Sequence, residues 1–297
     1  MEEKIKQDNR MQNGGVQREM TQKEHGYYMG KKPAPDAKQT RKLRGINGST
    51  LKLIAVISMV IDHTAAGVLG RLLSSRGLGN LDVNDFAAVN LWIEQNMTLF
   101  TAYNIMRMIG RIAFPIYCFL LIEGFERTRS RTKYALRLLL FAAISELPFD
   151  LMFNGQLLEF GYQNVFFTLF FGVVVMMGFQ WVQEHMSSKL VQMLLCAVVA
   201  AAGMGAAQLI YTDYAAIGVL CIIVMYLFRK KKINQILAGC VVFCWEITAP
   251  LAFVPVAFYN GKRGWKLKYF FYLVYPVHLL LLYLLCMGLG IAAYAPM

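Results

Sequence analysis

The stretch LKLIAVISMVIDH (residues 51–63) decides the fold class, because it is almost entirely apolar until it ends on Asp62 and His63. Apolar runs of similar length recur along the chain. Hydrophobic residues make up 57% of the 297 residues and charged residues 16%, and the mean hydropathy is +0.44, which excludes an ordinary soluble domain. The runs lack the alternating pattern of a membrane β-barrel. The sequence therefore predicts an all-α, polytopic transmembrane helical bundle with the lipid bilayer as its solvent.

Residues 1–48 are polar and rich in Gln, Lys and Gly, and the predicted membrane domain occupies residues 49–297. The tail has too few apolar residues to form a core, so we expect it to be disordered. Its excess of basic over acidic residues marks it as cytoplasmic. The net charge of +12 does not indicate a nucleic-acid partner, because the basic residues lie in the tail and in short connectors. The six cysteines lack the spacing of a metal site, so we expect no bound metal.

Window hydropathy predicts about nine membrane segments. The eighth is short and contains Pro250 and Pro255. The segments are expected near residues 51–72, 104–125, 134–153, 164–183, 190–210, 214–228, 233–247, 248–259 and 269–290.

Charge placement sets the predicted topology. With the tail inside, the basic connectors 126–133, 184–189 and 229–232 are cytoplasmic, as the positive-inside rule requires. Connector 260–268 joins them only if residues 233–259 turn back as a hairpin, so we expect that hairpin. The expected external loops are residues 73–103, 154–163 and 211–213, with a candidate interfacial helix at 88–100.

Ionisable side chains within spans are candidates for function, because a central Asp, Lys or Arg costs about 2.5–3.5 kcal/mol to insert. A rise of about 1.5 Å per residue places His63 and Glu146 about 18 Å, and Asp150 about 24 Å, from the cytoplasmic face. The same rise places Arg111 about 10 Å below the outer surface. These four residues are therefore predicted to share one layer.

Asp62 points about 100° away from His63 around the helix, so we expect it to neutralise an arginine. For the arginines and carboxylates the alternative is mutual pairing that holds the bundle together. A structural hydrogen bond is the alternative for His63. Glu246 and His278 are more readily explained as structural residues, and His278 is predicted to lie outside the layer.

Acyl transfer needs a neutral imidazole that accepts a proton, a carboxylate that orients it and an arginine that stabilises negative charge. No Ser or Cys lies in an evident nucleophile setting, so direct attack on a thioester is simpler than a covalent intermediate. The predicted catalytic residues are His63, Glu146, Asp150, Arg111 and Asp62. Two alternatives stay open: a transporter or channel whose ion path uses the carboxylates and arginines, and a catalytically silent scaffold.

Five segments together resemble the TraX family, whose namesake is implicated in N-terminal acetylation of conjugative pilin. The likeness runs from about Leu51 to Tyr283. The first helix is also similar to that of integral-membrane acyltransferases that modify envelope sugars, where Lys52 and His63 occupy the places of a basic residue and a catalytic histidine. The segments are LKLIAVISMVIDH, IGRIAFPIYCFLLIEGFERT, RLLLFAAISELPFDL, QNVFFTL, and YNGKRG followed by KYFFYLVYPVHLLLLYL.

The resemblance implies an acetyl-CoA-dependent acetyltransferase of the bacterial cytoplasmic (inner) membrane, with His63 as base. It leaves the acceptor open between a pilin-like protein and an envelope glycan. A CoA headgroup would need cytoplasmic cations, which topology alone would also place there. The cytoplasmic candidates are Arg127, Arg129, Arg131, Lys262 and Arg263, and Arg107, one turn above Arg111 in the second span, is a further candidate for cofactor binding.

Overall fold

The computed structural model describes residues 45–265 and 268–296, so most of the expected disordered tail lies outside the described residues. The described residues are helical apart from turns and two isolated bridges. The elements are α2 (Gly48–His63), a π-helical segment (Thr64–Leu69), α3 (Gly70–Ser75), a 3₁₀ turn (Leu78–Asn80), α4 (Phe86–Gly110), α5 (Ala113–Arg127), α6 (Arg131–Phe153), α7 (Val165–His185), α8 (Lys189–Leu209), α9 (Ala215–Leu227), α10 (Lys232–Val242), a 3₁₀ turn (Ala249–Ala252), α11 (Phe253–Ala257) and α12 (Lys268–Gly288).

Within residues 45–265 and 268–296, five helical runs are long and apolar enough to cross a bilayer, so the chain is a multi-helix membrane protein. The nine-segment count and the orientation of the N-terminus remain predictions. The runs are Gly48–Ser75, Phe86–Arg127, Val165–His185, Lys189–Leu209 and Tyr269–Gly288, and α9 and α10 are shorter apolar helices.

The first span begins where the sequence provides a cap. The side chain of Asn47 accepts hydrogen bonds from the backbone N–H groups of Ser49 and Thr50, at 2.9 and 3.0 Å. The helix then runs to His63 and continues directly into the π-helical segment. A π-helical turn widens the backbone and occurs frequently at functional sites. The change from α-helix to π-helix directly after His63 therefore makes His63 a candidate functional residue.

The structure tests two expectations for residues 73–125. The candidate interfacial helix at residues 88–100 is helical, as part of a longer helix, α4, which begins at Phe86 with Asp85 as its cap. The expected single span at 104–125 is broken between α4 and α5. The hydroxyl of Ser58 donates to the carbonyls of Ile109 and Gly110, at 2.6 and 3.1 Å, where α4 ends. Those carbonyls are thereby satisfied by α2 and the chain can turn at this point.

The hairpin expected from charge placement is present. After α10 the chain returns through α11, and Gly48 N–H donates to the carbonyl of Lys262 at 2.7 Å. Arg127 donates to the carbonyl of Gly261 at 2.7 Å, and Arg229 pairs with Glu126 at 2.7 Å. Three basic connectors therefore lie at one end of the molecule, beside the start of α2.

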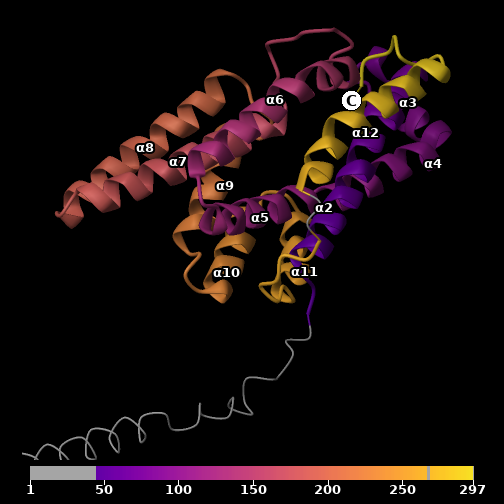
Figure 1. Ribbon diagram of the computed structural model, residues 1–297. Helices are drawn as coiled ribbons and strands as arrows, with labels where there is room; N and C mark the ends of the chain where they lie inside the picture. The colour runs from indigo at the N-terminus through magenta and orange to yellow at the C-terminus, as the bar shows by residue number, and fades with distance from the viewer. Residues whose placement is uncertain (1–44, 266–267, 297) are drawn as a thin grey trace, which may run out of the picture. The chain divides into compact units, whose positions relative to one another are not determined.

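The helices pack so that α2, α4 and α12 lie together on one side, while α7, α8 and α9 form the other (Figure 1). Helix α6 contacts both α12 and α7, and α5 contacts α2 and α9, so α5 and α6 join the two sides. The buried Arg71 of α3 ties the C-terminal segment to α6. Its guanidinium donates to the carbonyls of Ala292 and Tyr294 and, at 2.8 Å, to that of Met152.

Candidate functional site

Two cavities lie end to end within the bundle. One, here named the cationic cavity, has a volume of about 420 Å³, and the other, the histidine cavity, about 550 Å³. Both volumes are in the range of small-molecule sites. Met59, Tyr117, Val165 and Tyr275 line both cavities, so these four side chains form the wall between them.

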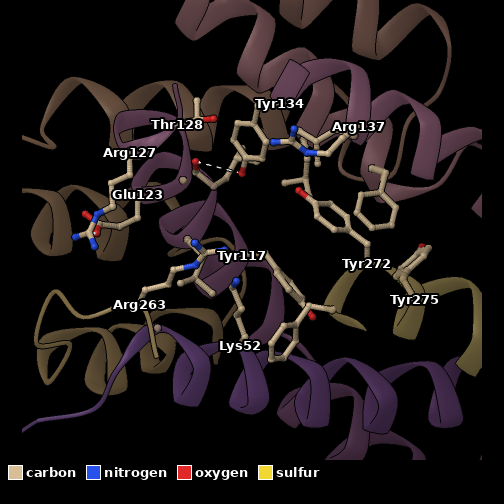
Figure 2. Close-up of a pocket in the computed structure, with 18 of the residues that line it drawn as sticks. Lys52, Tyr117, Glu123, Arg127, Thr128, Tyr134, Arg137, Arg263, Tyr272 and Tyr275 are labelled. Atoms are coloured by element: carbon tan, nitrogen blue, oxygen red, sulfur yellow. Dashed lines mark hydrogen bonds and ion pairs between the residues drawn. The ribbon is translucent and has the colours of Figure 1, made fainter. Parts of the chain in front are cut away.

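The cationic cavity lies beside the start of α2 and is lined by five basic side chains and one carboxylate, Glu123 (Figure 2). Arg127 pairs with Glu123 at 2.5 Å. Within the described ranges none of the other four has a carboxylate partner. This excess of positive charge suits a ligand that carries phosphate groups. The four side chains are Lys52, Arg129, Arg137 and Arg263.

Arg137 gives a second indication of an anionic ligand. Its Nε is buried and has no hydrogen-bond partner among the described residues. Its guanidinium lies 5.6 Å from the Tyr134 ring, and Figure 2 shows it between Tyr134 and Tyr272 at the cavity wall. A buried donor without a partner costs about 1–3 kcal/mol, so a bound acceptor group would be favourable there.

The histidine cavity contains two ion pairs. Asp62 binds Arg107 at 2.5 Å, and Arg111 binds Glu246 at 2.8 Å. The expectation that Asp62 neutralises an arginine is confirmed. Gly110 makes its pair possible, because a Cβ at that position would lie 2.1 Å from Asp62 Oδ1. The two pairs offset the cost of placing four charges inside the bundle.

Asp213 is a third carboxylate in the histidine cavity and was missed by the sequence analysis. The hydroxyl of Tyr162 donates to it at 3.0 Å, and burial raises its pKa to about 6. The backbone between α8 and the first residue of α9 is strained, because Tyr211, Tyr214 and Ala215 have φ values of 54°, 63° and 41°. Such strain in residues other than glycine concentrates at functional sites. A short connector in the sequence gives no sign of it.

His63 lines the histidine cavity. The expectation that His278 lies away from His63 was wrong. His278 of α12, predicted to lie outside the layer, has its Nε2 2.6 Å from Nδ1 of His63. The rings of Phe153 and Tyr275 meet His63 edge-on, with centroids 5.4 and 5.7 Å away. Depth along one helix cannot reveal which other helix lies beside it, so no pattern in the sequence indicates that α2 and α12 meet at His63.

The structure does not bring Glu146 and Asp150 into the lining of this cavity. Asn164, the cap of α7, donates to the carboxylate of Glu146. Asp150 accepts from the side chain of Asn154 at 3.0 Å and from the backbone N–H of Glu159 at 2.9 Å. The two carboxylates therefore hold the start of α7 and the loop that precedes it, which corresponds to the structural alternative.

The expected CoA-binding residues divide between several locations. Arg127 and Arg263 line the cationic cavity, as does Arg129. Arg131 stacks over the ring of Phe125 at 5.1 Å, and Lys262 is exposed on the neighbouring connector. Arg107 lies in the histidine cavity instead. Within the described residues, no group of three or more His, Cys, Asp or Glu side chains is arranged to hold a metal ion.

Comparison with known proteins gives one family. The model described as "TraX protein" matches residues 47–286. A curated relative, "Probable fimbrial assembly protein FimC, serogroup H1" of Dichelobacter nodosus, is 28% identical over 264 residues, covering 78% of this chain and 92% of the relative. No solved structure matches the chain.

Proposed function

The chain belongs to the TraX family, and from that premise we propose that it is an integral-membrane acetyltransferase that uses acetyl-CoA as donor. The acceptor is an amine or hydroxyl on an extracytoplasmic molecule. The relative named for fimbrial assembly supports a pilin-like protein over an envelope glycan as that acceptor.

The observation that carries this proposal is the pair of cavities that share one wall. The cationic cavity has the charge to hold the phosphates of CoA, and the residues present fit that group. With the basic connectors in the cytoplasm, as the positive-inside rule predicts, this cavity opens on the side where acetyl-CoA occurs. From Lys52 to His63 the helix rises about 17 Å, which the pantetheine arm would span.

The chemistry at the far end is a direct transfer. The acceptor nitrogen or oxygen forms a bond to the acetyl carbonyl carbon, and the bond from that carbon to the CoA sulfur breaks. His63 takes the proton that the acceptor loses and returns it to the departing thiolate, so the imidazole is neutral again at the end. Arg107 and Arg111 line the same cavity and supply positive potential toward the oxyanion, although each is already paired with a carboxylate.

The test is incubation of purified protein with labelled acetyl-CoA and a membrane extract. We expect label in a macromolecule and release of free CoA thiol. His63→Ala should reduce transfer by about 100- to 10,000-fold, the usual contribution of a general base. His185→Ala is the matched control, because His185 is an exposed histidine of α7 outside both cavities.

Two results would contradict the proposal. If His63→Ala protein inserts normally and still transfers acetyl at the wild-type rate, His63 is not the general base. Wild-type protein that releases no thiol but carries out ion uptake independent of acetyl-CoA would favour the transporter alternative.

A further inference from the structure

Three groups from two helices form a single hydrogen-bonded chain behind the histidine cavity. Nδ1 of His278 lies 2.7 Å from the carbonyl oxygen of Val274, one turn earlier in α12. Nε2 of the same ring lies 2.6 Å from Nδ1 of His63 in α2. The ring planes are only 9° apart and their centroids 4.9 Å apart. The distance between the ring centroids equals the N···N distance plus the radii of the two imidazole rings. The rings therefore meet edge to edge rather than face to face.

This chain determines where the protons are. A carbonyl oxygen only accepts, so Nδ1 of His278 carries a hydrogen and, in the neutral ring, Nε2 is the acceptor. Nδ1 of His63 must then be the donor, which leaves the lone pair of His63 on Nε2. Among the described residues no protein group bonds to that Nε2, and His63 lines the cavity whereas His278 does not.

We propose that His278 is a positioning residue that fixes His63 as the Nδ1–H tautomer and holds its Nε2 toward the acceptor. The inference rests on the proposed function and adds to it a partner for the base. When His63 takes the acceptor's proton on Nε2, the ring becomes a cation and its Nδ1–H bond to His278 becomes charge-assisted. No proton needs to move to His278 for this stabilisation.

A packing role does not account for the arrangement. His278 is only 8% exposed, and a buried imidazole costs free energy that an apolar side chain of similar size would not. Within the described residues neither histidine has a carboxylate partner. The edge-on rings of Phe153 and Tyr275 restrict rotation of His63, so that its ring orientation and its bond to His278 are set together.

Two polar substitutions separate the two hydrogen bonds of His278. In His278→Gln the amide oxygen reaches the place of Nε2 and can accept from His63. In His278→Asn the shorter amide reaches only the place of Nδ1, so contact with His63 is lost. Both variants keep a polar group of similar size in the same buried position. His185→Gln is the control, because His185 makes the same one-turn bond, Nδ1 to the carbonyl of Trp181 at 2.9 Å, without a histidine partner.

The rate of label transfer is measured for each purified variant over a range of acetyl-CoA concentrations, with the same membrane extract as acceptor source. We expect His278→Asn to lower kcat about 10- to 100-fold, the range found when a group that orients a metal-binding histidine is removed. The KM for acetyl-CoA should stay unchanged, because the donor's phosphates bind in the other cavity. His278→Gln should recover most of the lost kcat, and His185→Gln should match the wild type.

A wild-type kcat in His278→Asn overturns the positioning role. Equal losses in the Asn and Gln variants overturn it too, because the effect would then follow the packing of the ring rather than the bond to His63. Wild-type protein that transfers no acetyl group overturns the proposed function, and the inference with it. Transfer that requires His63 but is indifferent to residue 278 overturns the inference alone.

Discussion

Replacement of Arg137 by Gln tests whether the cationic cavity binds CoA. Arg137 lies in α6 at the cavity wall, and its buried Nε has no partner among the described residues. Gln keeps a polar side chain there but removes the charge. If a phosphate of CoA accepts from this guanidinium, the substitution removes a charged hydrogen bond in a half-buried setting.

The expected magnitude follows from burial. A hydrogen bond to a charged group contributes about 1.5–3 kcal/mol, so Arg137→Gln should weaken CoA binding about 10- to 150-fold. Arg263 lines the same cavity but is exposed to solvent. An exposed ion pair contributes up to about 1 kcal/mol, so Arg263→Gln should weaken binding by no more than about fivefold. That smaller effect should disappear at high salt.

Isothermal titration of the purified variants with CoA measures these affinities without turnover. The matched control is Lys262→Gln, because Lys262 is adjacent to Arg263 on the same connector but does not line the cavity. Unchanged affinity in Arg137→Gln, or an equally large loss in Lys262→Gln, would show that CoA does not bind in the cationic cavity.

Three further predictions concern the wall and the far cavity. Met59→Ala opens the wall between the two cavities. Because one methylene changes the discrimination between two substrates about 10- to 200-fold, the ratio of butyryl to acetyl transfer, measured with butyryl-CoA and acetyl-CoA, should rise at least about tenfold. An unchanged ratio would show that residues other than Met59 limit the acyl length. Gly110→Ala puts a Cβ 2.1 Å from Asp62 Oδ1, so overpacking should cost about 1–3 kcal/mol and lower the Tm in a thermal-shift assay, and a wild-type Tm would refute that close contact. The pKa of Asp213 is raised from 3.8 to about 6 by burial, so its neutral form stabilises the fold fully below about pH 4, an effect lost as pH rises through about 6. Asp213→Asn should therefore raise the Tm at pH 7.5, with a gain that shrinks between pH 6 and pH 4, and a constant difference across this range would exclude Asp213 as its source.

The features of the fold that were predictable follow from composition and charge. An apolar run ended by polar residues is enough to identify the first span, and basic connectors are enough to require the hairpin at residues 233–259. The break in the second span was not predictable, because it depends on Ser58 of another helix bonding the carbonyls of Ile109 and Gly110. The sequence pattern within residues 104–125 cannot predict a contact with a different helix.

The site divides in the same way. Because an ionisable side chain is costly to place in a bilayer, His63, Asp62 and Arg111 could be identified from the sequence as candidate functional residues. It could not identify their partners, because depth fixes only one coordinate and leaves open which helices face one another. Arg111 binds Glu246 and His63 binds His278, and both partners come from distant segments that the sequence favoured as structural.

The four residues predicted to share one layer differ in how much hydrogen-bonding capacity the fold leaves them. Arg111 is ion-paired, Asp150 accepts two hydrogen bonds from the loop before α7, and Glu146 binds the cap of that helix. His63 alone among the four faces a cavity with a ring nitrogen that no described residue binds. Burial cost therefore selects candidates but does not separate scaffold from site, because the cost assigned from the sequence is the same whether or not the fold later gives the side chain a partner. The separation needs two conditions together, an atom that no described residue binds and a cavity for that atom to face. Glu146 has a buried Oε1 without a partner among the described residues but lines neither cavity, so of the four residues only His63 meets both conditions.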